Sequence, residues 1–172
     1  MRLATPAETR RGRVSPMGYG WAARMTADLL DYTRVRFAGG IPVQRAPADL
    51  RMVVEKVIAE LTAIHPAVGI DLRVNGDCRG SWDADRAAQV VANLLANAID
   101  HGIEGAPVSV TLDEVGDAVA LEVRNAAGTH ATTSGLGLGL YVSRDVIQAH
   151  GGTLNVTAED GVFTVRAVWP TS

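Results

Sequence analysis

Residues 134–150 have the sequence "SGLGLGLYVSRDVIQAH", in which three glycines alternate with leucines directly before an amphipathic segment. The apolar spacing after the glycines predicts a helix that ends near His150, where the imidazole is expected to complement the helix dipole. A helix N-terminus has unpaired N–H donors and a partial positive charge, so it binds phosphate well. Glycines there let the backbone come close to a phosphate. The run indicates a phosphate-binding turn or, equally well, a flexible hinge.

A polar pattern lies upstream in "NLLANAIDH", residues 93–101. Asn93, Asn97 and His101 are four residues apart, so they share one face of a helix expected over about 83–101 and opened by Asp83. Asparagine is a poor residue inside a helix, so two on one line favour a ligand. Amide oxygens suit Mg²⁺, and amide nitrogens suit phosphate oxygens. The alternative is that both asparagines satisfy neighbouring backbone groups.

The remaining patterns predict the fold class. A third helix is expected from Asp49, as its N-cap, to a stop at Pro66. Alternating apolar residues predict a strand at about 70–74 and two hairpins, which turn at Gly116-Asp117 and at Asp160-Gly161. Helices on one side of a mostly antiparallel sheet make an α+β two-layer sandwich.

Composition excludes several classes of protein. Apolar residues make up 47% of the 172 residues and charged residues 20%, so a packed core is possible. Residues 1–51 hold nine arginines against four acids, and the rest holds seven bases against fifteen acids. An acidic body argues against nucleic-acid binding. The sequence shows no signal peptide and no long apolar run, so we expect a cytoplasmic protein with no membrane segment in this chain.

The N-terminal part is expected to stand apart from the sandwich. Residues 1–16 have no apolar period, and we interpret them as a disordered arm. Apolar residues at heptad spacing follow, which predicts packing against a partner helix and a homodimer through residues 17–37; they are Ala22, Met25, Leu29 and Tyr32.

The asparagine and glycine patterns in this order resemble the catalytic, ATP-binding domain of sensor histidine kinases, in particular the bacteriophytochrome-like branch, whose asparagine helix ends in "HG". The resemblance covers about residues 41–170. It implies the Bergerat fold, a mixed, mostly antiparallel sheet covered by three helices, with ATP between helices under a mobile lid. Residues 17–40 would be the remnant of a dimerisation helix, and residues 41–172 the ATP-binding domain.

The resemblance also implies a set of site residues. Asn97 would ligate Mg²⁺, Asn93 would support the phosphates, and Asn125 would accept the adenine amino proton where the family usually has aspartate. The expected contacts with ATP are Asn93, Asn97, His101, Asn125, Gly128, Gly135, Leu136, Gly137, Leu138 and Gly139.

Three departures bear on activity. No histidine lies in the family's acceptor motif, the lid has only nine residues between Asn125 and Gly135, and Asp100 replaces a lysine that is frequent there. We therefore expect a histidine kinase domain that transfers the γ-phosphoryl group of Mg·ATP to a histidine on another segment or chain, with a response regulator as a further partner. No catalytic base can be named. The departures leave open inactivity of the chain by itself, a degenerate docking module, and a serine kinase of the anti-sigma type.

Overall fold

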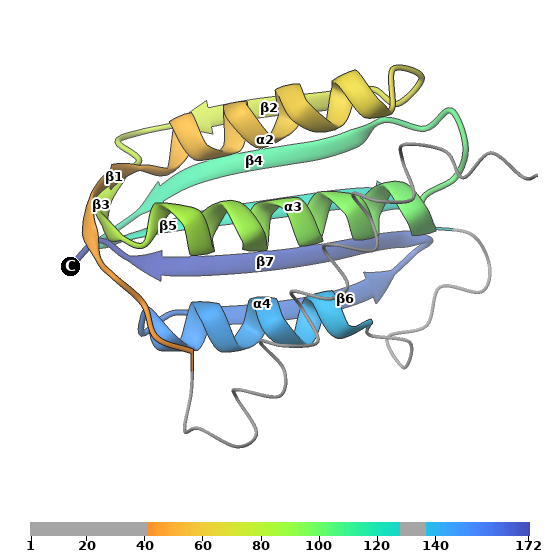
Figure 1. Cartoon of the computed structure of the whole chain (residues 1–172). Helices are drawn as coiled ribbons and strands as arrows, with labels where there is room; N and C mark the ends of the chain where they lie inside the picture. Colours follow the sequence, from red (N-terminus) through yellow and green to blue (C-terminus); the bar gives the residue numbers. More distant parts are fainter. Residues whose placement is uncertain (1–40, 128–136) are drawn as a thin grey trace, which may run out of the picture.

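The computed structural model describes residues 41–127 and 137–172. Within these ranges three helices cover one face of a five-stranded sheet, as Figure 1 shows. The helices are α2 (Leu50–Ile64), α3 (Ala84–His101) and α4 (Leu138–Ala149). The expected disordered arm, dimerisation helix and lid lie outside the described residues and stay predictions.

The sheet is mixed, with strand order β2-β4-β5-β7-β6. Its strands are β2 (Ile70–Asn75), β4 (Val108–Val115), β5 (Ala118–Ala126), β6 (Thr153–Glu159) and β7 (Val162–Pro170). The β2–β4 pair is parallel and the other three pairs are antiparallel. The two hairpins turn at the predicted residues, so the predicted α+β sandwich is confirmed.

A separate two-stranded sheet forms where the chain enters the domain. β1 (Ala46–Asp49) pairs antiparallel with β3 (Arg79–Trp82). The Trp82 indole is fully buried and donates to the carbonyl of Pro170 at 2.7 Å. This contact ties the small sheet to the end of β7, close to the C-terminus (Figure 1).

Local side-chain caps determine where α2 and α3 begin. The Asp49 carboxylate accepts from Arg51 N at 2.9 Å, and the Asp83 carboxylate accepts from Arg86 N at 3.1 Å. Each such cap is worth about 1 kcal/mol of stability. Both predicted N-caps are therefore confirmed.

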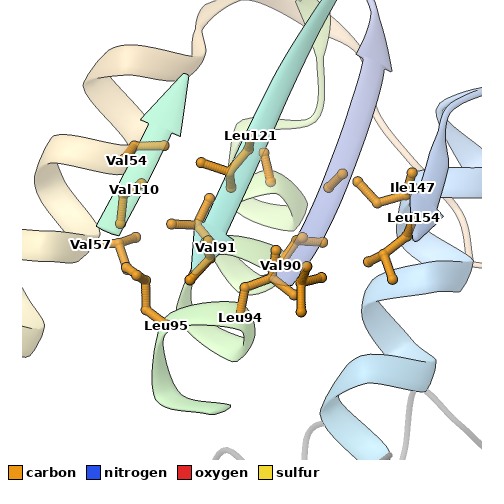
Figure 2. Close-up of a cluster of buried hydrophobic side chains, with 14 of the residues drawn as sticks. Val54, Val57, Val90, Val91, Leu94, Leu95, Val110, Leu121, Ile147 and Leu154 are labelled. Atoms are coloured by element: carbon orange, nitrogen blue, oxygen red, sulfur yellow. The ribbon is translucent and has the colours of Figure 1, made fainter. Parts of the chain in front are cut away.

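The core fills the space between the helices and the sheet, and Figure 2 shows its central part. α3 is the middle helix and packs against both α2 and α4. Its side chains Val90, Val91, Leu94 and Leu95 point toward the sheet and are completely buried. None of the helices in the described ranges is both long and apolar enough to cross a membrane.

Candidate functional site

The predicted polar face of α3 becomes more exposed toward the end of the helix. The Asn93 side chain is 7% exposed, Asn97 is half-buried and His101 is exposed. Burial of an asparagine requires a hydrogen-bond partner, because an unmade bond costs about 1–3 kcal/mol. The three residues therefore have different environments although they share one face.

Asn93 contacts the first turn of α4. Its Nδ2 donates to the carbonyl oxygen of Gly139 at 3.2 Å, and the buried Ser143 hydroxyl donates to the same oxygen at 2.7 Å. A methyl group on Gly139 would lie 3.3 Å from Asn93 Cγ, which is tighter than ordinary packing. The absence of a side chain at Gly139 thus lets α3 and α4 approach each other. The structure brings the asparagine and glycine patterns together at this contact.

Gly137 has a different environment from Gly139. It is the N-cap of α4, it is exposed, and no side chain caps the helix there. A Cβ atom added to Gly137 would meet no described atom within 4 Å. Its φ of −64° is accessible to any residue, so neither sterics nor backbone conformation requires glycine. The uncapped end of a 12-residue helix, with no described atom close to a Cβ placed on its N-cap, suits an anion.

We predict that Gly137→Ala affects mainly nucleotide binding, whereas Gly139→Ala affects mainly the packing of α3 against α4. Gly137→Ala should lower the affinity for Mg·ATP about tenfold and change the free energy of unfolding by less than about 1 kcal/mol, because only the ligand meets the new methyl group. Alanine in place of glycine inside a helix usually raises the free energy of unfolding by about 0.5–1 kcal/mol. Gly139→Ala should not raise it, because Asn93 must move to make room for the methyl group. Urea unfolding and titration with a fluorescent ATP analogue measure both. A Gly139→Ala protein that is about 1 kcal/mol more stable would show that this contact does not limit the approach of α3 and α4.

Asn125 carries an unpartnered acceptor. The residue is 4% exposed, and its Nδ2 donates to the adjacent Ala126 carbonyl at 3.3 Å. Its Oδ1 is buried and has no hydrogen-bond partner among the described residues. Such an atom costs about 1–3 kcal/mol unless a ligand or water supplies a donor. The amide thus presents an acceptor that the fold does not use.

Asn125 lines a hollow of about 380 Å³ between the end of α3, the α2–β2 loop and the loop that follows α3. The other lining residues are mostly apolar and include Ala98, Ile99, Val108 and Val68. A mostly apolar hollow with one unpartnered acceptor suits a flat heterocycle that carries an amino group.

The wall of this hollow includes a segment that the sequence patterns did not identify. Ile103 N donates to the Ala126 carbonyl at 3.0 Å, and Ala106 N donates to the Ile103 carbonyl at 3.0 Å, which closes a turn around Gly105. Gly105 has a φ of +81°, as the third residue of a type II turn requires. The residues "EGAP" at 104–107 indicate a turn, but the neighbouring sequence contains no pattern that places this turn beside a cavity.

The predicted residues occupy two neighbouring places along α3. The hollow at Asn125 is lined by Ala98, Ile99 and Gly102, and the α3–α4 contact lies two turns earlier at Asn93. Neither Asn97 nor His101 lines the hollow. Leu138 is half-buried at the start of α4. The expected contacts at Gly128, Gly135 and Leu136 lie outside the described residues.

A larger hollow, of about 480 Å³, lies around Trp82 and Asp83 at the opposite end of α3. No residue expected to contact ATP lines it. Its two carboxylates are Asp83, which caps α3, and Asp85. We therefore place the candidate site at the other end, where Asn125 carries a buried acceptor that no described residue bonds.

The donor set for Mg²⁺ is sparse. Among residues 41–127 and 137–172 no three His, Cys, Asp or Glu side chains gather as a cation site. The Asn97 side chain makes no hydrogen bond to any described residue, so its amide oxygen is available as a ligand. A hard cation with few protein ligands keeps water and takes phosphate oxygens, which is how Mg²⁺ is usually held beside a nucleotide. The residues present fit a Mg²⁺ that is bound together with a triphosphate.

Comparisons with known proteins show the family and the fold. Residues 82–172 match the family described as "Histidine kinase-, DNA gyrase B-, and HSP90-like ATPase". A bacteriophytochrome of Pseudomonas aeruginosa is 34% identical over an alignment of 161 positions, which covers 82% of this chain and 22% of that protein. The sensor histidine kinase ZraS of Escherichia coli K12 is 33% identical over an alignment of 101 positions, which covers 51% of this chain and 22% of that protein. The chain thus spans about a fifth of the length of these relatives.

Solved structures share the fold. The Acinetobacter baumannii histidine kinase AdeS superposes with a TM-score of 0.74 at 21% identity, over 90% of this chain and 80% of that chain. The histidine kinase ThkA, solved in complex with the response regulator protein TrrA, gives a TM-score of 0.73 at 19% identity, over 99% of this chain and 53% of that chain.

Proposed function

The chain belongs to the family of histidine kinase-, DNA gyrase B- and HSP90-like ATPases, and from this membership we propose that its domain binds Mg·ATP and provides the γ-phosphoryl group that is transferred to a histidine. In this reaction the bond from the terminal phosphorus to the bridging oxygen breaks, a phosphorus–nitrogen bond to imidazole forms, and ADP leaves. Because ATP is the donor, the reaction belongs in the cytoplasm.

The observation that carries this proposal is the buried Oδ1 of Asn125. It has no partner in the described structure and lines a mostly apolar hollow. The 6-amino group of adenine would donate to it, and the apolar residues of α3 would contact the faces of the base. An amide oxygen accepts such a bond without the added strength that a carboxylate provides.

The triphosphate would extend from this hollow along α3 toward the start of α4. The Asn97 oxygen would hold Mg²⁺, which when bound neutralises charge on the phosphates. The N–H groups that follow Gly137 would receive phosphate oxygens. Asn93 contacts α4 through one proton of its Nδ2, and the second proton would support a phosphate oxygen. Catalysis of this kind depends mostly on positioning and charge stabilisation.

The acceptor histidine would come from elsewhere. His150 is completely buried, His65 caps the end of α2, and His101 ends α3. His130 lies outside the described residues. We therefore infer an acceptor helix on another segment or chain, with a response regulator as a further partner. The homodimer through residues 17–37 stays a prediction.

The first experiment is a titration of the full chain with a fluorescent ATP analogue, with Mg²⁺ and with EDTA. We expect saturable binding that Mg²⁺ strengthens and that excess adenosine reduces. Transfer of ³²P from ATP to an isolated hairpin of dimerisation helices with an acceptor histidine then tests the reaction. Acid-labile label on that hairpin supports a histidine kinase, and acid-stable label on a serine supports the serine-kinase alternative. Failure of wild-type protein to bind the analogue would contradict the proposal and favour a docking module.

A further inference from the structure

His150 is a buried titratable side chain with no part in the proposed reaction. It follows α4 and has no exposed surface. Its Nε2 accepts from the backbone N–H of Asp83 at 3.0 Å, and its Nδ1 lies 2.8 Å from the Val146 carbonyl oxygen. A ring that accepts at Nε2 must carry its single proton at Nδ1, which then donates to Val146. His150 is therefore uncharged in this arrangement, and its Nδ1–H meets a carbonyl oxygen in the last turn of α4.

Asp83 connects His150 to two further parts of the chain. Its backbone N–H donates to His150, its Oδ1 accepts from Arg86 N at the start of α3, and its Oδ2 accepts from Gln44 N at 2.9 Å. Burial raises the pKa of the Asp83 carboxyl, and the N–H donors of Gln44 and Arg86 are the largest of the opposing effects that together hold that pKa below its ordinary value. The carboxylate is thus held in its charged form between both donors.

The incoming segment, residues 41–45, makes a second contact with the end of α4. The Arg45 guanidinium donates to the Ala149 carbonyl at 3.4 Å and to the Ser172 carbonyl at 3.2 Å. Ile41, at the start of this segment, is buried in the core. Hydrogen bonds therefore run from the incoming segment through Asp83 and His150 into the last turn of α4.

This junction and the candidate nucleotide site lie at opposite ends of the same two helices. α3 and α4 run antiparallel side by side (Figure 1). The junction joins the start of α3 to the end of α4, and Asn93 contacts the start of α4 near Gly137. A helix that is held at one end shifts at both ends when its attachment changes, because packed helices move as rigid units.

We propose that His150 is a positioning residue that couples the backbone of the incoming segment to the placement of α4, and through α4 to the nucleotide site. A displacement of residues 41–45 would release Gln44 from Asp83, loosen the bond from Asp83 to His150, and change the approach of α4 to Asn93. The consequence for the site rests on the proposed function, whereas the coupling of the segment to α4 does not.

The test removes one N–H group far from the site. Gln44→Pro deletes the donor to Asp83 at a residue with an exposed side chain outside any helix or strand, and Gln44→Ala keeps that donor as the matched control. In the full chain, amide hydrogen exchange is measured across residues 138–149. We expect Gln44→Pro to speed this exchange about fivefold over Gln44→Ala, the factor that one net hydrogen bond confers.

His150→Ala and the double variant with Gln44→Pro complete a cycle. His150→Ala should speed exchange in α4 by more than Gln44→Pro, and the double variant should match His150→Ala, because the coupling runs through that ring. His150→Gln keeps one acceptor and should restore part of the protection. His65→Ala, which removes a histidine at the end of α2, should leave α4 unchanged. If His150→Ala does not fold, the comparison of Gln44→Pro with Gln44→Ala decides whether residues 41–45 are coupled to α4.

Two outcomes would overturn the proposal. In the first, amide exchange in α4 is equally fast in Gln44→Pro and Gln44→Ala. In the second, the free-energy effects of Gln44→Pro and His150→Ala on this exchange add up in the double variant. The affinity for the fluorescent ATP analogue is measured on the same proteins and should fall about two- to fivefold in Gln44→Pro. A wild-type chain that does not bind the analogue contradicts the proposed function, while the exchange data still decide the coupling.

Discussion

Replacing Asn97 by alanine should stabilise the protein and weaken nucleotide binding at the same time. The side chain is half-buried and makes no hydrogen bond to a described residue, so its removal breaks no hydrogen bond within the described residues. Alanine is the better helix former by about 0.5 kcal/mol, which should appear as a higher free energy of unfolding in urea. The affinity for Mg·ATP should fall about 10- to 100-fold, the effect of a lost bond to a charged group.

The dependence on Mg²⁺ identifies the role of Asn97. In EDTA, wild type and Asn97→Ala should bind the fluorescent analogue equally, because the lost ligand acts through the cation. Asp100→Ala on the same helix is the control, and it should not weaken binding, because the exposed carboxylate it removes repels phosphate. A lower affinity of Asn97→Ala that persists unchanged in EDTA would contradict the assignment of Asn97 to Mg²⁺.

Asn125→Leu should also raise stability and abolish recognition of adenine. Leucine has the same branching as asparagine and removes a buried acceptor that has no partner among the described residues, so the free energy of unfolding should rise by about 1 kcal/mol. The Ala126 carbonyl still accepts from Ile103 N, so no new polar group is left unpaired there. Binding of adenosine and of ATP should both become undetectable by titration, because the lost contact is to the base.

Two further variants make this prediction specific. Asn125→Asp keeps an acceptor and should retain binding of adenosine, but it buries a charge and should lower stability. Asn155→Leu places the same change at an exposed position of β6 and should alter neither binding nor stability by more than about 0.5 kcal/mol. If Asn125→Leu binds adenosine as wild type does, Oδ1 does not read the base and the hollow is not the adenine pocket.

The elements that could be predicted are those that depend on near neighbours in the sequence. Asp49 and Asp83 each bond an N–H two or three residues away, so the starts of both helices follow from local patterns. The hairpin at Asp160-Gly161 was predicted for the same reason, because two adjacent residues with positive φ form the turn. The ordered pair of motifs indicated the family because both motifs are continuous stretches of chain.

The sequence by itself therefore determined the three described helices, the hairpins, the α+β class and the family. Only the tertiary structure decided that Asn93 bonds Gly139 across 46 residues, that the Oδ1 of Asn125 has no partner in the described part of the chain, and that His150 is an uncharged link to Asp83 across 67 residues. The physical reason is the separation of the interacting residues along the chain. Caps, turns and amphipathic periods depend on residues that are only a few positions apart. The partner of a buried polar group instead depends on how complete helices and strands pack, which no local pattern contains.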